Sequence, residues 1–106
     1  MKGNFIMAVR DISMGTKVGL ELVTDKWNAL TLSHLTATPT GFMTLRRQVR
    51  GISTLRLLTV LAKLTQLDLV ISTDEYEYGL TAEGLKLQTG LANLEAWGNQ
   101  VITEMQ

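Results

Sequence analysis

The stretch from Thr40 to Val70 restricts the fold of this chain more than any other, because it places a tight turn between two helical segments. Gly51 stands at the turn, and glycine readily adopts the left-handed conformation that commonly ends a helix. Ser53 follows as an expected N-cap, since its hydroxyl can accept a hydrogen bond from a backbone N–H of the next helix. A helix, a glycine turn and a capped helix in this order predict a helix-turn-helix motif.

Apolar residues spaced three and four apart predict the helices around this turn. One helix is expected from 18 to 35, with Asp25 capping a restart at Lys26. It should end before Thr36, because the segment around Pro39 has turn chemistry. A short helix then precedes the glycine turn and a longer helix follows it. Their inward-facing residues are expected to be Leu20, Val23, Trp27, Leu30 and His34, widened by Leu32 and Leu35, then Phe42, Leu45 and Val49, and finally Leu57, Leu61 and Leu64.

A β-hairpin is predicted after these helices. Residues 68–72 read as a strand and residues 73–75 as a compact turn. Tyr76, Tyr78 and Leu80 alternate with polar or small residues, which predicts a half-buried return strand. A two-stranded hairpin is weak alone and depends on packing against helices. The expected fold class is therefore mainly α with a small β-hairpin, in the order of a winged helix-turn-helix.

The last predicted helix covers residues 81–106, with Thr81 as its N-cap. Gly84, Gly90 and Gly98 each lower its intrinsic stability by up to about 1 kcal/mol relative to alanine. A helix with three glycines needs packing partners, so we expect a homodimer interface formed together with an N-terminal arm, residues 1–17. The expected interface residues are Leu87, Leu91, Leu94, Trp97 and Val101, and Met105 continues the same stripe.

The chemistry of an enzyme is not expected. The 106 residues suit one domain, 1–106, and contain no cysteine and a single histidine, His34, so neither a thiolate site nor a metal site is predicted. No nucleophile–base pair, phosphate-binding glycine loop or carboxylate pair stands out, and we expect no cofactor. The chain has no apolar run near the ~20 residues that span a bilayer and no signal-peptide pattern, so we expect a cytoplasmic protein without membrane contact.

The charges are unevenly distributed although the net charge is zero. Residues 1–63 hold nine of the ten Lys and Arg residues against three acids, a net +6, and residues 64–106 hold one against seven, a net −6. A basic part centred on a helix-turn-helix indicates DNA binding, in which cations neutralise phosphates and base contacts specify sequence. The expected DNA-binding residues are Arg46, Arg47 and Arg50 on phosphates, Arg56 near a base edge, and Ser53, Thr54, Thr59 and Lys63. Solvated surface charge is the alternative for each cation.

Three apolar residues of the second motif helix, Leu55, Leu58 and Val60, fall partly away from its inward seam. They allow three interpretations: contact with thymine methyl groups, a protein-binding patch, or burial of one or two of them in the core. Two functions follow. The first is a homodimeric DNA-binding transcriptional regulator, and the alternative is a winged helix repurposed for protein–protein interaction with weak or no DNA binding.

From about Leu20 to Trp97 the sequence resembles the HxlR-type bacterial transcriptional regulators. DKWNALTLSHL is similar to the first-helix segment of that family, FMTLRRQVRGIS to its F-x-x-L…G-I-S turn, and EYGLTAEG to the entry to its last helix. Trp97 matches a tryptophan common near the end of that helix. The leucine pattern of the family is matched by Leu57, Leu61, Leu64, Leu69 and Val70.

The resemblance implies a dimer on operator DNA, with the second motif helix in the major groove and the hairpin as a wing. Family members often respond to electrophiles through a cysteine near the N-terminus, which this sequence lacks, so the resemblance identifies no effector. The wing is also shorter than in the family and carries Asp74, Glu75 and Glu77, which phosphates would repel. Asp68 stands at a family glycine position, where aspartate is tolerated because it visits the left-handed region more readily than most residues.

Overall fold

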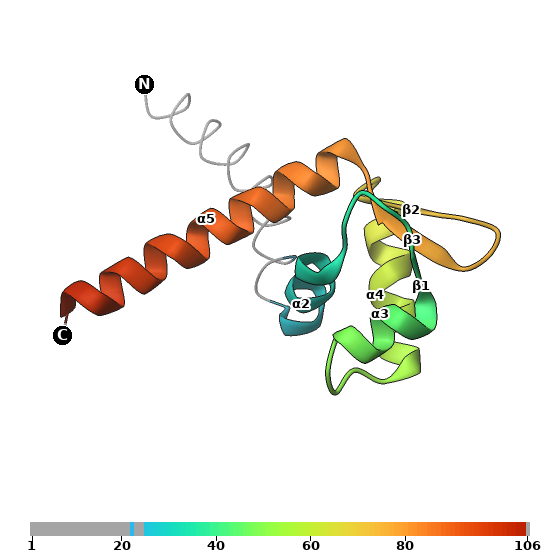
Figure 1. The fold of residues 1–106 in the computed structure, drawn as a ribbon, viewed down its shortest axis with the longest axis horizontal. Helices are drawn as coiled ribbons and strands as arrows, with labels where there is room; N and C mark the ends of the chain where they lie inside the picture. The colour runs from blue at the N-terminus through green and yellow to red at the C-terminus, as the bar shows by residue number, and fades with distance from the viewer. Residues whose placement is uncertain (1–21, 23–24, 106) are drawn as a thin grey trace, which may run out of the picture.

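The structure, a computed structural model, describes Leu22 and residues 25–105 as a mainly helical winged helix-turn-helix (Figure 1). The predicted arm of residues 1–17, together with Leu20 and Val23 of the first predicted helix, lies outside the described residues. In chain order the described elements are α2 (Lys26–His34), β1 (Thr40–Gly41), α3 (Phe42–Gln48), α4 (Thr54–Gln66), β2 (Val70–Ser72), β3 (Glu77–Leu80) and α5 (Ala82–Met105).

Helix α2 begins and ends where the sequence predicts. The Asp25 carboxylate accepts hydrogen bonds from the backbone N–H groups of Trp27 at 2.9 Å and Asn28 at 3.2 Å. These bonds satisfy two of the donors that the first turn of a helix leaves unpaired. The helix ends at His34, before Thr36.

The buried face of α2 agrees with the predicted one only in part, since Leu32 and Leu35 are buried as expected. His34 is exposed, and Trp27 and Leu30 are only half-buried at the edge of the core. Apolar residues lie on all sides of this nine-residue helix, so packing against α3, α4 and α5 selects which of them are covered. The buried residues are Asn28, Thr31, Leu32 and Leu35.

Helices α3 and α4 form the predicted helix-turn-helix. Gly51 has a φ of +86°, the left-handed conformation that the turn requires. The Ser53 hydroxyl accepts a hydrogen bond from the backbone N–H of Arg56 at 3.0 Å and caps α4 as predicted. Phe42 is half-buried, and the rest of the predicted seam is buried together with Ile52: Leu45, Val49, Leu57, Leu61 and Leu64.

A left-handed aspartate ends α4 and starts the wing. Asp68 has a φ of +60°, its N–H donates to the carbonyl of Thr65 at 3.0 Å, and the N–H of Leu69 donates to the carbonyl of Leu64 at 3.0 Å. This pair of bonds is a Schellman motif, which pairs the last carbonyls of a helix. Strand β2 therefore begins at Val70, two residues later than predicted.

The sheet has three strands rather than the predicted two. Its antiparallel order is β1-β3-β2, with Thr40 opposite Tyr78 and Val70 opposite Leu80. Strand β1 has two residues, too few to give a sequence pattern. It pairs with β3 because the segment before α3 runs alongside that strand. Gly79 allows this approach, because a Cβ there would lie 3.1 Å from the carbonyl oxygen of Ala37.

The prediction for Tyr76 is wrong. Its φ is +57° and its side chain is 72% exposed, whereas Tyr78 and Leu80 are buried as predicted. The wing turn extends one residue further than the alternation suggests. Thr73 holds this turn, because its hydroxyl accepts from the N–H groups of Glu75 at 3.3 Å and residue 77 at 3.2 Å.

Helix α5 starts beside the sheet, and its C-terminal half projects beyond the other described elements (Figure 1). The Thr81 hydroxyl accepts from the N–H of Gly84 at 3.1 Å, as expected for an N-cap. A Cβ at Gly84 would overlap the backbone oxygen of Leu69, so the start of α5 packs directly on the turn before β2. Gln88 ties α5 to α2, since its Nε2 donates to the carbonyls of Leu32 at 2.9 Å and Leu35 at 2.7 Å.

Candidate nucleic-acid interface

Four exposed arginines lie on the helix-turn-helix. Arg46 and Arg47 are in the last turn of α3, Arg50 is in the turn between the helices, and Arg56 is in the first turn of α4. The guanidinium of Arg47 donates to the hydroxyl of Thr44 at 3.4 Å. Among the described residues, none of the four arginines forms an ion pair with a carboxylate.

The sequence explains why these charges lack acidic partners nearby. Residues 26–67 contain six Lys and Arg residues and no aspartate or glutamate, and the segment is bounded by Asp25 and Asp68. Both bounding aspartates serve helix ends, the first as an N-cap and the second as a left-handed C-terminal residue. All six charged side chains from residue 26 to residue 67 are therefore positive, which suits a polyanionic partner.

The polar residues predicted for the site lie around the start and the outer side of α4. Ser53 and Thr54 are exposed, and the Ser53 oxygen is already used as the helix cap. Thr59 is exposed, and its hydroxyl donates to the backbone carbonyl of Leu55 at 2.9 Å. Lys63 is half-buried one turn further along the helix.

The structure shows which of Leu55, Leu58 and Val60 are buried in the core and which are exposed. Val60 is 4% exposed and belongs to the core, three residues after Leu57 and four before Leu64 on the same buried face. Leu55 and Leu58 are 74% and 46% exposed. Burial in the core therefore explains Val60 only. Leu55 and Leu58 are left exposed for contact with DNA or with a protein.

The outermost line of α4 is a feature that the sequence analysis did not single out. It lies opposite the buried face and contains Leu55, Thr59, Ala62 and Gln66, all exposed and separated by four, three and four residues. On an α-helix this spacing gives one line along the surface. Counting helical positions from Leu55, away from the buried seam, would have found it.

The wing does not add to the positive surface. Its tip carries the exposed Asp74 and Glu75, and Glu77 is half-buried at the start of β3. No Lys or Arg occurs between Lys63 and Lys86. Phosphates are repelled by such a tip, so the wing supplies no cation to hold DNA.

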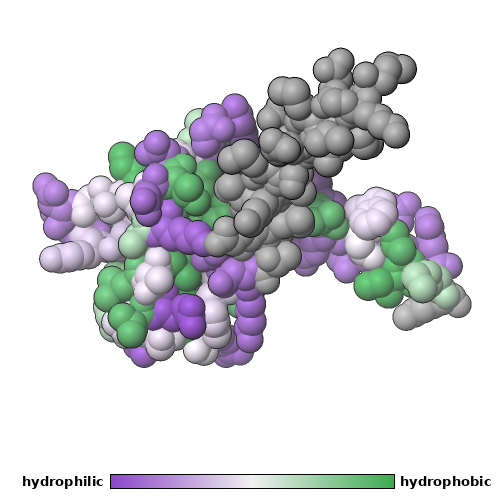
Figure 2. All heavy atoms as spheres, turned by 180° about the vertical axis from the view of Figure 1, so that it is seen from behind, coloured by the Kyte–Doolittle hydropathy of each residue, from purple (hydrophilic) through white to green (hydrophobic). Residues whose placement is uncertain are grey.

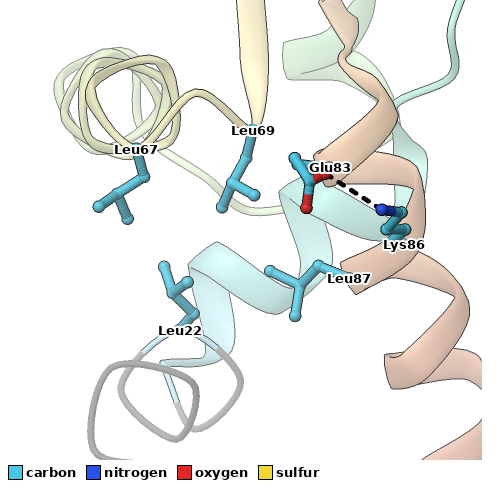
Figure 3. A pocket seen from close by; sticks show the side chains of 6 residues that line it. All are labelled: Leu22, Leu67, Leu69, Glu83, Lys86 and Leu87. Atoms are coloured by element: carbon cyan, nitrogen blue, oxygen red, sulfur yellow. Dashed lines mark hydrogen bonds and ion pairs between the residues drawn. The ribbon is translucent and has the colours of Figure 1, made fainter. Parts of the chain in front are cut away.

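An open pocket of about 430 Å³ lies away from this surface, between the end of α4 and the start of α5 (Figure 3). Leu22, Leu67, Leu69 and Leu87 point into the same space, and an ion pair of 3.2 Å between Lys86 and Glu83 lies at its edge. Both charged side chains are largely exposed, and exposed pairs of this kind contribute little to stability. The lining is apolar and holds no group arranged for nucleophilic or metal chemistry.

Leu22 and residues 25–105 offer neither a metal site nor a membrane span. No group of three or more His, Asp or Glu side chains there could hold a metal ion. No helix in the same range is both long enough and apolar enough to cross a membrane.

A capped helix-turn-helix, a small wing and a basic motif surface together define a DNA-binding regulator of the winged-helix class. The comparison with protein families agrees with this class. The chain belongs to the HxlR-like helix-turn-helix family, whose model matches residues 22–106, and it is a DNA-binding transcriptional regulator.

Solved structures with the same fold are also regulators. The quinone-bound YodB from B. subtilis is 27% identical, with 81% of this chain and 96% of that chain covered and a TM-score of 0.75. A protein described as a possible HxlR family transcriptional factor from Thermoplasma volcanium is 25% identical, with 79% and 81% covered and a TM-score of 0.65. A proposed MarR-family regulator from Enterococcus faecalis is 25% identical, with 88% and 90% covered and a TM-score of 0.75. No curated protein matches the sequence.

Proposed function

We propose that this chain regulates transcription as a homodimer that places its two α4 helices in the major groove of operator DNA. Arg46, Arg47 and Arg50 contact phosphates on either side of the groove, and Arg56 reaches a base edge from the first turn of α4. The observation that carries the proposal is the helix-turn-helix with four exposed arginines and no acidic residue from 26 to 67. A two-fold dimer would read half-sites about 34 Å apart, one turn of the duplex.

The exposed part of α5 supports the proposed dimer. Leu87 and Leu91 pack at the edge of the core, whereas Leu94 is 54% and Trp97 is 64% exposed in the single chain. Figure 2 shows hydrophobic residues at the projecting end of α5, away from the body of the molecule. Exposed apolar surface of this kind marks an interface. The residues 81–106 then form a dimerisation helix, with Leu94, Trp97 and Val101 facing the partner.

Two glycines fit the same interface. Apart from the adjoining residues and the backbone of α5 itself, no atom of the described chain lies within 4 Å of the position that a Cβ would take at Gly90 or Gly98. Each glycine weakens the helix by about 1 kcal/mol relative to alanine. Close approach of a second helix accounts for their presence, because a missing side chain lets two helix backbones pack more closely.

The experiment combines a mass measurement with DNA binding. Light scattering after size-exclusion chromatography at micromolar concentration should give the mass of a dimer. Fluorescence anisotropy with a labelled non-specific duplex should show binding in 50 mM salt that weakens strongly in 200 mM salt, as phosphate neutralisation requires. A monomeric mass would contradict the dimer, and a chain that binds no duplex even at the lower salt would contradict DNA recognition.

The second candidate function is a protein–protein interaction module, and the exposed Leu55 and Leu58 are the observation in its favour. It predicts that the two leucines support protein assembly while DNA binding is weak or absent. The anisotropy measurement separates the two functions. DNA recognition is preferred because the same motif carries four exposed arginines and no acidic residue from 26 to 67, which an apolar protein partner would not neutralise. For a bacterial-type regulator we also propose a cytoplasmic location, where it meets its DNA.

A further inference from the structure

The outermost line of α4 presents methyl groups rather than hydrogen-bond donors over its first two turns. Leu55 is 74% exposed, and Thr59 and Ala62 follow it at spacings of four and three on the same exposed line. At a rise of about 1.5 Å per residue, these three side chains cover roughly 10 Å of helix.

The hydrogen bond of Thr59 makes this line more apolar than its sequence suggests. The Thr59 hydroxyl donates its hydrogen to the backbone carbonyl of Leu55 at 2.9 Å. That hydrogen is therefore committed within the helix and is not offered to a base. What remains on these two turns of the outer line is the isobutyl group of Leu55, the methyl groups of Thr59 and Ala62, and the Thr59 oxygen, which can accept a hydrogen bond but not donate one.

The chemistry of the major groove then selects one base. Guanine presents acceptors, cytosine presents a donor and adenine presents both, and each of these edges is read by polar side chains. Thymine alone presents a methyl group in the major groove, and apolar side chains contact it. A methyl-bearing helix line therefore fits A·T pairs and leaves the polar edges of G·C pairs without a partner.

The surrounding charges favour DNA over a protein as the occupant. Arg56 adjoins Leu55 in the sequence, and Arg46, Arg47 and Arg50 lie on the preceding helix and turn. The motif contains no acidic residue to compensate them. Phosphates flank the major groove on both sides, so a single DNA duplex can contact the arginines through its phosphates and the apolar line through its bases.

We propose that Leu55, supported by Thr59 and Ala62, determines sequence specificity by contacting thymine methyl groups, so that each half-site contains A·T pairs under α4. This inference rests on the proposed function, since it assumes that α4 enters the major groove. Leu55 acts on the choice of sequence, and Arg46, Arg47 and Arg50 on the phosphates supply affinity that does not depend on sequence.

The test removes single methyl groups from DNA. Duplexes that the native chain prefers are selected from a random library, and each thymine is replaced in turn by deoxyuridine, which lacks only the 5-methyl group. Loss of one buried methyl group should weaken binding about fourfold. We expect this effect at one or two positions in each half-site for the native chain, and no effect at those positions for Leu55→Ala.

Matched variants keep the test specific. Leu55→Ala should fold normally because the side chain is mostly exposed, and thermal melting checks this. Ile71→Ala removes an aliphatic side chain that is 57% exposed on β2 and should keep the full response to deoxyuridine. Leu55→Ala should also keep its affinity for non-specific duplex.

The outcomes distinguish this inference from the proposed function. If the native chain binds DNA but no thymine is sensitive to loss of its methyl group, or if Leu55→Ala keeps the same sensitivity, methyl contact is overturned while DNA regulation stands. If Leu55→Ala instead abolishes contact with a protein and leaves DNA binding unchanged, the line is a protein-docking surface. If the native chain binds no duplex at low salt, the proposed function and this inference fail together.

Discussion

Removal of three positive charges from the helix-turn-helix should change the salt dependence of DNA binding by a calculable amount. The perturbation is the triple variant Arg46→Gln, Arg47→Gln, Arg50→Gln, which shortens the side chains and removes their charge. In the proposed dimer it eliminates six phosphate contacts. Each contact contributes about 0.9 to the negative slope of log K against log salt, so the slope should become shallower by about 5.

The same change in slope predicts the loss of affinity for DNA. Between 50 and 200 mM salt, six such contacts account for a fall of about 10³-fold in the binding constant of the native chain. The binding constant of the triple variant should therefore fall about 10³-fold less than that of the native chain over this salt range. At 50 mM salt the variant should bind DNA more weakly than the native chain. Fluorescence anisotropy with one non-specific duplex, titrated at four or five salt concentrations, measures both slopes.

Folding should be almost unaffected, because the three side chains are exposed and form no ion pair among the described residues. Surface changes of this kind usually lie within about 0.5 kcal/mol, which is roughly 2–4 °C in Tm for a domain of this size. Lys86→Gln, an exposed cation on α5, is the control for one lost charge outside the motif and should leave the slope unchanged. Parallel slopes for the native chain and the triple variant would refute the assignment of phosphate contacts to these arginines.

Three further substitutions test the scaffold and the dimer. Gly84→Ala would place a methyl group on the backbone oxygen of Leu69 and should destabilise the fold by about 1–3 kcal/mol in urea unfolding; equal stability would show that α5 does not pack this closely. Trp97→Ala should shift the mass in light scattering from dimer toward monomer, and an unchanged dimer would remove Trp97 from the interface. Gln88→Ala leaves two carbonyls at the end of α2 without their side-chain donor and should cost about 1–3 kcal/mol by the same unfolding assay; a cost near zero would mean that water replaces the amide.

The acidic wing has a consequence for how this regulator holds DNA. Its tip residues Asp74 and Glu75 are exposed, and Thr73 holds the turn in one shape through two backbone hydrogen bonds. A negatively charged tip is repelled by phosphates, so in the proposed complex the grip on the duplex depends on the helix-turn-helix. The proposed role of Arg46, Arg47 and Arg50 is correspondingly larger than it would be beside a basic wing.

Local features of the fold were predictable because their causes lie within a few residues. Asp25, Ser53 and Thr81 cap helices through hydrogen bonds to N–H groups two or three residues ahead. Asp68 ends α4 through its left-handed conformation, and Gly51 uses the same conformation in the turn between α3 and α4. The order of elements and the helix-turn-helix follow from such signals, and so does the resemblance that the family model confirms.

The candidate site was predictable only in part. The sequence places Arg46, Arg47, Arg50 and Arg56 on the motif, and the structure shows them exposed. The sequence alone does not reveal that the Thr59 hydroxyl donates a hydrogen bond within the helix, because this bond depends on the side-chain conformation. The methyl-bearing character of the outer line of α4 therefore becomes visible only in the structure.

Local sequence signals were enough to predict the caps of α2, α4 and α5, the basic character of residues 1–63 and the order of a winged helix-turn-helix, since each of these depends on neighbouring residues or on composition. The folded chain alone shows that α2 buries Asn28 and Thr31, that Val60 belongs to the core while Leu55 does not, and that Thr40 and Gly41 add a third strand beside β3. These outcomes depend on contacts between residues distant in the sequence, and apolar spacing within one element cannot tell which of its faces another element will cover.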